Sequence, residues 1–323
     1  MKTRVTRSAG VAAELIRAGG VVAFPTETVY GLGASAWNEE AVRKIFKAKG
    51  RPGDNPLIVH VGDAGWIGEV ARRVPKVAER LMEAFFPGAL SLVLPKGKRI
   101  PEVVTAGLDT VGVRMPDHKV GGEFLRLCGV PVAAPSANRS GRPSPTRWED
   151  VWEDLEGRID GILRGGVVRI GVESTVVDCT VSPPVVLRVG GVTVEKLRGV
   201  APGIRVGEGV DAEGVARSPG MKYRHYAPRA EVVLVEGPEE IPAGAARRAG
   251  YLGLVEAPAE LRFLRRQVCG NVEGYARRLY GFLRACDAAG ANRIYCQKVP
   301  GSGLGRAVGD RLARAAAGSP SAR

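Results

Sequence analysis

Short apolar runs alternate with amphipathic stretches through the first half of the chain, which predicts strands interleaved with helices. The run at residues 21–24 is typical of a buried strand, and residues 26–33 follow it as a polar loop with two glycines. Asn38 then fits the N-cap of a helix whose apolar positions within residues 42–46 recur with helical spacing. A second apolar run at residues 57–61 predicts another strand, so strand, loop, helix and strand succeed each other within about forty residues.

The same pattern continues to the end of the chain. Further helices are predicted at residues 9–18, 64–70, 75–86, 123–128, 272–289 and 304–317. Further strands are predicted at residues 90–94, 111–114, 130–134, 162–163, 167–168, 174–177, 185–189, 231–235, 250–255 and 293–296. Thr146 and Glu149 have the spacing of a capping box at the start of one more helix. Strands mixed with helices without strict alternation favour an α/β fold with a sheet of mixed direction.

Length and composition place the chain among ordinary globular proteins. Its 323 residues suggest two domains of about 150 residues each, and a passage rich in Gly, Pro and charge at 202–228 reads as a linker. No apolar run approaches the ~18 residues that span a membrane, and the N-terminus lacks the apolar core of a signal peptide. The five cysteines are widely spaced, which argues against a zinc site or a secreted disulfide framework. We expect a cytoplasmic protein that does not contact membranes.

The charge balance favours anionic partners. Lys and Arg number 47 against 34 Asp and Glu, a net charge of +13, which suits nucleotides, pyrophosphate or RNA. Lys44, Lys47, Lys49 and Arg51 crowd the end of the helix after Asn38. This crowding fits either a cradle for a polyanion or a solvated basic helix terminus.

Several common catalytic motifs are missing from the sequence. It has no Walker-type phosphate loop, and its three histidines and its carboxylates do not cluster as metal ligands do. We therefore expect no organic cofactor and no dedicated metal cage, with any Mg²⁺ carried on substrate phosphates. Instead, polar residues interrupt the apolar runs at predicted strand exits, where α/β sheets place their ligands. They are Lys49, Arg51, Thr110, Arg114, Ser136, Asn138, Ser144, Ser174 and Arg188.

Five longer segments carry a resemblance to a known family. They are FPTETVYGLG at 24–33, KAKGRP to NPLIVH across 47–60, AAPSAN at 133–138, ESTVVD at 173–178 and SPGMKYRHYAP at 218–228. Together they resemble the threonylcarbamoyl-AMP synthases in their two-domain form, and the resemblance covers nearly the whole chain.

The resemblance implies a fold and a domain division. The expected fold is α/β, with a YrdC-like twisted mixed sheet and helices forming a catalytic domain at 1–205. A small Rossmann-like α/β accessory domain is expected at 230–323. Between them, residues 206–229 would serve as a linker and a lid with Tyr226 over bound ATP, although a linker that merely packs its rings for stability fits the same composition.

The family makes L-threonylcarbamoyladenylate from L-threonine, bicarbonate or CO₂, and ATP, and releases pyrophosphate. A separate transferase complex then passes the threonylcarbamoyl group to an adenosine beside the tRNA anticodon, so contact with tRNA is compatible with this reaction but not required by it. By resemblance, Lys49 and Arg51 would be catalytic, as cations that we expect to be exposed. The ATP site would comprise Arg51, Asn55, Thr110, Ser136, Asn138, Ser144, Arg188 and Tyr226. The threonine site would comprise Thr28, His60, Arg114, Ser174 and the backbone near Ala134.

Two other functions remain open on the sequence. A basic RNA-binding module would explain the charge, and its binding would weaken steeply with salt. A carbamoyl-adenylate-forming enzyme would share the YrdC-like domain but would use carbamoyl phosphate and would not depend on threonine. The transferase or zinc-finger segments that accompany such enzymes are missing from this chain.

Overall fold

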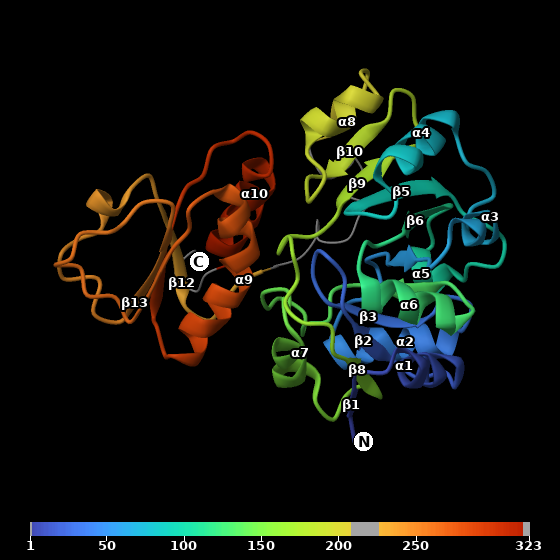
Figure 1. The fold of residues 1–323 in the computed structure, drawn as a ribbon, viewed down its shortest axis with the longest axis horizontal. Helices are drawn as coiled ribbons and strands as arrows, with labels where there is room; N and C mark the ends of the chain where they lie inside the picture. Colours follow the sequence, from blue (N-terminus) through green and yellow to red (C-terminus); the bar gives the residue numbers. More distant parts are fainter. Residues whose placement is uncertain (1, 208–225, 319–323) are drawn as a thin grey trace.

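The computed structural model describes residues 2–207 and 226–318, which form two α/β units side by side (Figure 1). The larger unit is built on an 11-stranded mixed sheet in the order β1-β8-β2-β3-β7-β4-β6-β5-β9-β10-β11. Its strands are β1 (Arg4–Thr6), β2 (Val22–Phe24), β3 (Gly31–Ser35), β4 (Ile58–His60), β5 (Leu90–Pro95), β6 (Thr110–Arg114), β7 (Val132–Ala134), β8 (Gly161–Leu163), β9 (Thr175–Asp178), β10 (Val185–Arg188) and β11 (Arg205–Val206).

Helices surround this sheet. They are α1 (Ala9–Arg17), α2 (Glu39–Lys49), α3 (Ile67–Val70) with the 3₁₀ turn η1 (Ala64–Trp66), α4 (Lys76–Phe85), α5 (Glu102–Thr105), α6 (Lys119–Cys128), α7 (Trp148–Leu155) and α8 (Val194–Val200). The main core lies between the sheet and its helices, and Leu32, Ile45, Val59 and Leu92 are among its fully buried members.

The smaller unit is a separate four-stranded sheet in which every strand pairing is parallel. Its strands are β12 (Glu231–Val235), β13 (Ala249–Gly253), β14 (Arg265–Val268) and β15 (Arg293–Gln297), in the order β12-β15-β13-β14. The 3₁₀ turn η2 (Pro238–Glu240) follows β12. Helices α9 (Val272–Ala288) and α10 (Gly305–Ala317) lie between this sheet and the larger unit (Figure 1). The expected fold class, a twisted mixed sheet followed by a small Rossmann-like domain, is confirmed.

Local sequence signals define helix α2 as predicted. Asn38 caps its first turn, with Oδ1 accepting from the backbone N–H of Ala41 at 3.0 Å. The helix ends at Gly50, whose φ of +61° is the left-handed conformation that glycine adopts at little cost. This short, glycine-terminated turn fixes the direction in which Lys49 and Arg51 leave the helix.

The end of one predicted loop is in fact part of a central strand. Residues 31–33, predicted as the end of the polar loop at 26–33, belong to β3, which runs between β2 and β7. The glycines that suggested a loop are there because neighbouring side chains fill the space above them. A Cβ on Gly33 would lie 2.5 Å from Cγ1 of Val132 and 2.9 Å from the ring of Phe24.

Two smaller predictions also need correction, and some short elements were not predicted. The capping box is wrong, because the helix begins only at Trp148 and Thr146 instead donates its backbone N–H to Asp150 Oδ2 at 3.1 Å. Residues 167–168 are not a strand. Helix α8 and strand β14 were not predicted, because both are short and β14 contains only polar residues before Val268. Within the described residues, no helix is long and apolar enough to cross a membrane.

Candidate active site

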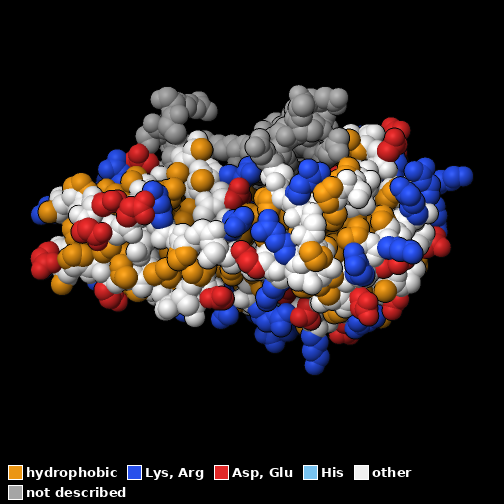
Figure 2. All heavy atoms as spheres, turned by 90° about the horizontal axis from the view of Figure 1, so that it is seen from above, with side chains coloured by type: hydrophobic (Ala, Val, Ile, Leu, Met, Phe, Trp, Pro, Cys, Tyr) orange, Lys and Arg blue, Asp and Glu red, His pale blue; other side chains and the backbone are white. Residues whose placement is uncertain are grey.

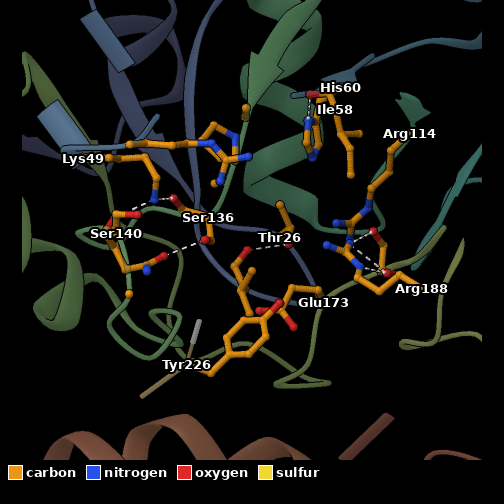
Figure 3. A pocket seen from close by; sticks show the side chains of 18 residues that line it. Thr26, Lys49, Ile58, His60, Arg114, Ser136, Ser140, Glu173, Arg188 and Tyr226 are labelled. Atoms are coloured by element: carbon orange, nitrogen blue, oxygen red, sulfur yellow. Dashed lines mark hydrogen bonds between the residues drawn. The ribbon is translucent and has the colours of Figure 1, made fainter. Parts of the chain in front are cut away.

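A pocket opens beside β4, the ends of β6 and β7 and the start of β9, where the chain enters the smaller unit (Figure 3). It brings together ten of the residues that the sequence singled out: Lys49, Arg51, His60, Arg114, Ala134, Ser136, Asn138, Ser174, Arg188 and Tyr226. It is also lined by residues that were not singled out: Thr26, Val29, Gly31, Ile58, Pro135, Ser140, Gly141 and Glu173. Four cations from distant parts of the sequence thus share one cavity.

The other four predicted residues do not line this pocket. Thr28 lies behind Arg114 and accepts a hydrogen bond from it, and Ser144 donates to Glu173 at 2.7 Å. Thr110 lines a small separate cavity next to Ile58. The side chain of Asn55 is completely buried, and neither its amide oxygen nor its nitrogen has a hydrogen-bond partner among the described residues.

Lys49 forms one wall of the pocket (Figure 3). Its ammonium donates to the backbone carbonyls of Ser136 at 2.6 Å and Asn138 at 2.5 Å. The expectation of an exposed cation is wrong, since Lys49 is only 3% exposed. Burial, and then the charge of Arg51, lower the pKa of Lys49 well below its ordinary value. The lysine therefore joins α2 to the loop after β7 through its two carbonyl contacts.

The side chain of Asn138 shapes this loop and does not point freely into the pocket. Its amide donates to the carbonyls of Arg139 at 2.9 Å and Arg142 at 2.8 Å. Its Oδ1 accepts the hydroxyl of Ser136 at 2.5 Å. Arg51 similarly ties its own loop, donating to the carbonyls of Asn55 and Pro56 at 3.2 and 3.3 Å.

Arg114 forms the opposite wall (Figure 3). One guanidinium nitrogen lies 2.9 Å from Glu27 Oε2 and donates to Thr28 Oγ1 at 2.8 Å. Both members of the Arg114–Glu27 pair are buried, so their charges attract in a medium that screens them poorly. The pair holds the guanidinium in one orientation at the pocket edge.

His60 is a neutral member of this wall. Its Nδ1 lies 3.1 Å from the carbonyl of Ile58, and Phe24 meets its ring edge-to-face at 5.6 Å. Burial, and then the positive charge of Arg114, lower the pKa of His60 to about 3. The imidazole thus adds no charge to the pocket near neutral pH.

Glu173 connects the pocket to the smaller unit. One carboxylate oxygen accepts from Ser144 at 2.7 Å, and the other accepts from the Tyr280 hydroxyl at 3.0 Å and from Nε of Arg311 at 2.8 Å. Burial opposes the charge of Glu173, but Arg311 and Arg188 together with these hydrogen bonds lower its pKa. The carboxylate is therefore ionised, and Arg311 balances its charge.

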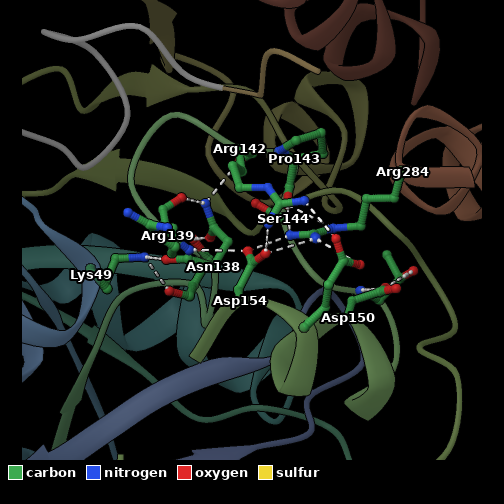
Figure 4. A network of polar contacts seen from close by, with 12 residues as sticks. Lys49, Asn138, Arg139, Arg142, Pro143, Ser144, Asp150, Asp154 and Arg284 are labelled. Carbon is green, nitrogen blue, oxygen red and sulfur yellow. Dashed lines mark hydrogen bonds and ion pairs between the residues drawn. The ribbon is translucent and has the colours of Figure 1, made fainter. Parts of the chain in front are cut away.

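A second connection holds the loop after β7. Arg284 on α9 donates to the carbonyl of Pro143 and pairs with Asp154 at 2.7 Å, with both side chains buried (Figure 4). Asp154 in turn accepts the backbone N–H of Arg139 at 3.1 Å and pairs with Arg142. Helix α9 thus secures the loop that Lys49 binds from the other side.

Tyr226 is the first described residue after 207, so the expected lid at 206–229 lies largely outside the described residues. Its φ of +65° is unusual for a residue other than glycine and is a conformation that accumulates at functional sites. The ring lines the pocket, stacks on Tyr280 with centroids 5.4 Å apart, and lies 5.5 Å from the guanidinium carbon of Arg311.

Comparison with known proteins agrees with this geometry. Residues 14–190 match the Sua5/YciO/YrdC family model, described as telomere recombination, and residues 192–317 match the model of the threonylcarbamoyl-AMP synthase C-terminal domain. The chain belongs to the threonylcarbamoyl-AMP synthase family.

Individual relatives match over nearly their whole length. The threonylcarbamoyl-AMP synthase of Pyrococcus abyssi is 48% identical across 94% of this chain and 93% of its own. That of Bacillus subtilis is 47% identical across 95% and 92%. The crystal structure of P. abyssi Sua5 complexed with L-threonine superposes with a TM-score of 0.90 at 44% identity, covering 98% of this chain and 97% of that one.

Sequence reasoning missed Glu173 in the pocket wall, Glu27 and Ser91 next to that wall, and three residues of the smaller unit, Tyr280, Arg284 and Arg311. Glu27 and Glu173 lie inside two of the five segments that carry the family resemblance, so their place in a motif was an available signal. The residues of α9 and α10 gave no such signal, because an arginine on an amphipathic helix is usually solvated.

Proposed function

We propose that this protein makes L-threonylcarbamoyladenylate from L-threonine, bicarbonate or CO₂, and ATP, with release of pyrophosphate. This is the first step of N⁶-threonylcarbamoyladenosine formation in tRNA. Family membership supports the reaction, and the observation that carries it is the set of four fixed cations, Lys49, Arg51, Arg114 and Arg188, around one pocket. Their charges match the carboxylates and phosphates of these substrates.

The reaction requires no nucleophile from the protein, because the substrate carboxylate is itself the attacking group. It requires instead that the reactants are held in the right positions. The threonine amine and bicarbonate give an N-carboxylate and water. One oxygen of that carboxylate attacks the α-phosphorus of ATP, the bond from this phosphorus to the bridging oxygen breaks, and pyrophosphate leaves. Lys49 and Arg51 supply positive charge where negative charge develops, and the pocket holds the reactants together.

The threonine half of the site is assigned to the wall formed by Arg114. Its planar guanidinium suits the amino-acid carboxylate, and Glu27 and Thr28 fix its direction before the substrate arrives. We assign Ser174, neutral His60 and the backbone near Ala134 to the remainder of the amino acid.

The ATP half is assigned to the opposite wall and to the entry of the smaller unit. Arg51 and Ser136 line the pocket on that wall, Tyr226 lines it at the entry of the smaller unit, and Arg188 lines it next to Ser174. Asn138 and Ser144 are positioned to act through the loops that they hold. Asn55 and Thr110 complete the assignment. The buried amide of Asn55, which lacks a described partner, suits a nucleotide.

We propose that Mg²⁺ enters on the phosphates of ATP. Glu173 is the carboxylate that lines the pocket, and its oxygens are already engaged by Ser144, Tyr280 and Arg311. Among the described residues, no group of three or more His, Cys, Asp or Glu is arranged as a metal cage. A metal held chiefly by phosphate oxygens and water fits this donor set.

The product is a reactive mixed anhydride, so a threonylcarbamoyl transferase complex acting on tRNA would consume it. We place this pathway in the cytoplasm. Direct contact with tRNA remains a second candidate function, because Lys and Arg side chains gather over parts of the larger unit (Figure 2). Salt distinguishes the two, since binding through RNA phosphates weakens steeply with salt and threonine-dependent ATP turnover does so much less.

The test of the proposed function is ATP consumption with and without L-threonine and bicarbonate, with the product identified by mass. The expected result is pyrophosphate release that requires both co-substrates, and a product with the mass of threonylcarbamoyladenylate. Turnover that needs carbamoyl phosphate and ignores threonine would instead establish the carbamoyl-adenylate alternative.

A further inference from the structure

Strand β5 carries one polar residue that the proposed function does not use. Ser91 interrupts the run from Leu90 to Leu94, and its side chain is completely inaccessible to solvent. A hydroxyl buried among apolar neighbours is disfavoured unless it finds a hydrogen-bond partner. Ser91 finds one in Ser174, with the two hydroxyl oxygens 2.8 Å apart.

The sheet places Ser91 directly behind the threonine half of the pocket. β5 lies between β6 and β9. The parallel register that pairs Leu90 with Thr175 sets Ser174 at the start of the neighbouring strand. The antiparallel register that pairs Leu92 with Val113 brings Arg114 alongside Ser91 on the other neighbour. Ser174 and Arg114 line the pocket, whereas Ser91, which lies between them in the sheet, does not.

Counting donors and lone pairs assigns a direction to the hydrogens in this cluster. A serine hydroxyl has one hydrogen to donate and two lone pairs to accept with. Arg188 donates to the Ser174 hydroxyl at 3.2 Å, and a guanidinium has no lone pair with which to accept. Among the described residues, Ser174 is the only partner of the Ser91 hydroxyl, so Ser91 must donate to it to satisfy its own hydrogen. Both lone pairs of Ser174 are then occupied.

We propose that Ser91 is a positioning residue that makes Ser174 a fixed hydrogen-bond donor toward the side-chain hydroxyl of L-threonine. The single hydrogen left on Ser174 is then available to the pocket, because Ser91 and Arg188 occupy its two lone pairs. The carboxylate of the amino acid is the natural partner of Arg114, which leaves the side-chain hydroxyl as the oxygen for Ser174. This inference rests on the proposed function and deepens it. It assigns the preference for a hydroxyl-bearing amino acid to Ser174, which would contact the substrate, and to Ser91, which would orient Ser174.

The experiment replaces Ser91 and compares L-threonine with L-2-aminobutyrate, which lacks the hydroxyl. In Ser91→Ala, Ser174 loses one donor and is free to rotate. We expect the KM for threonine to rise by about 3–10-fold, the value of one hydrogen bond, with kcat and the KM for ATP nearly unchanged. The preference for threonine over L-2-aminobutyrate, measured as a ratio of kcat/KM values, should shrink by a similar factor.

Three further variants separate positioning from general damage. Ser91→Thr keeps the hydroxyl and should restore the preference, and Ser91→Cys, a weak donor of similar shape, should give an intermediate value. Thr3→Val is the matched control, because Thr3 is equally a buried hydroxyl, donating to the Ile159 carbonyl at 2.8 Å and accepting from Gly157 at 2.9 Å, remote from the pocket. It should lower Tm and leave the preference intact.

The outcomes are distinct. A reduced preference in Ser91→Ala that Ser91→Thr restores supports the proposal. An unchanged preference in Ser91→Ala, or in Ser91→Cys if the alanine variant does not fold, overturns it. Wild-type protein without threonine-dependent ATP consumption would refute the proposed function itself, which is a separate result from the failure of the serine pair.

Discussion

The two units of the molecule use their buried polar residues in opposite ways. In the larger unit, polar side chains at strand ends converge on the unit's own pocket. In the smaller unit, buried Arg284, Arg311 and Tyr280 lie on α9 and α10 and turn away from their own sheet toward the larger unit. The smaller unit therefore behaves as an outer wall of the site, since its residues hold Glu173 and the loop after β7.

This difference changes one expectation from the sequence. The lid expected at 206–229 would complete the site without the smaller unit, and on that expectation a chain ending at Pro228 would retain much of the activity. The structure contradicts the premise, because such a chain would lack Tyr280 and Arg311, which bind a carboxylate of the pocket. We now expect that fragment to lose activity together with the interface.

The largest effect should come from breaking the contact between the units. Arg311→Met leaves the Glu173 carboxylate buried without its cation, which costs about 3–5 kcal/mol in the free energy of unfolding. Urea denaturation measures this cost. The matched control is Arg43→Met, which removes an exposed pair with Glu39 and should cost about 0–1 kcal/mol.

Adding Glu173→Gln to Arg311→Met removes the stranded charge and should recover part of the stability. If Arg311→Met proved no more destabilising than the exposed control, the contact of the smaller unit with Glu173 would not stabilise the protein. The contrast drawn between the two units would then be wrong.

Next in size is the loss of charge at the reacting phosphate. Arg51→Ala should reduce kcat by about 10²–10³, the usual result of deleting a group that stabilises developing charge. Lys49→Met should do the same and should also lower Tm, because Lys49 is buried and joins two backbone carbonyls. Steady-state pyrophosphate release is the measurement, and exposed Lys47 on the same helix gives the control Lys47→Ala. Normal turnover in a folded Arg51→Ala would remove this residue from the site.

The free energy of unfolding should depend on pH in a way that reports the buried His60. The pKa of His60 is lowered from 6.5 to about 3 by burial and by Arg114, so the unfolded chain binds a proton between these values that the folded chain does not. Its contribution to stability is therefore complete above pH 6.5 and declines as the pH falls toward 3, by up to about 1.4 kcal/mol per pH unit.

His60→Gln removes the group that takes up a proton on unfolding, so the unfolding free energy should fall less steeply as the pH is lowered. Urea titrations at pH 4, 5, 6 and 7 measure this slope. Equal slopes for the wild type and His60→Gln would mean that this imidazole is protonated in the folded protein.

The smallest effect should come from deleting the hydroxyl of Tyr280 at the interface between the two units. Tyr280→Phe keeps the ring that stacks on Tyr226 but deletes the hydroxyl that donates to Glu173. Tyr275→Phe deletes a similar hydroxyl on the same helix, one that donates to Gln297 inside the smaller unit. Each should cost about 1 kcal/mol of stability. Only Tyr280→Phe should also alter turnover, and equal activities would show that Glu173 tolerates the loss.

The sequence by itself determined the elements whose causes are local. Helix α2 followed from its Asn38 cap, its apolar spacing and Gly50, all of which act within one turn of the helix. The strand-end positions of Arg114 and Ser174 followed from apolar runs interrupted by single polar residues. Strand β3 was missed because the reason for its glycines is the ring of Phe24 and the side chain of Val132 on neighbouring strands, which no local pattern records.

Only the tertiary structure decided which side chains act together. Arg311 and Glu173 are separated by 138 residues, and Arg284 and Asp154 by 130. The local sequence around one residue of each pair therefore does not indicate its partner. The same holds for Ser91, whose partner Ser174 lies 83 residues away. Burial also changed the expected environment of Lys49. Its position at the end of a basic helix predicts a surface cation. Its ammonium is instead enclosed and satisfied by two carbonyls, because the loop after β7 folds over it.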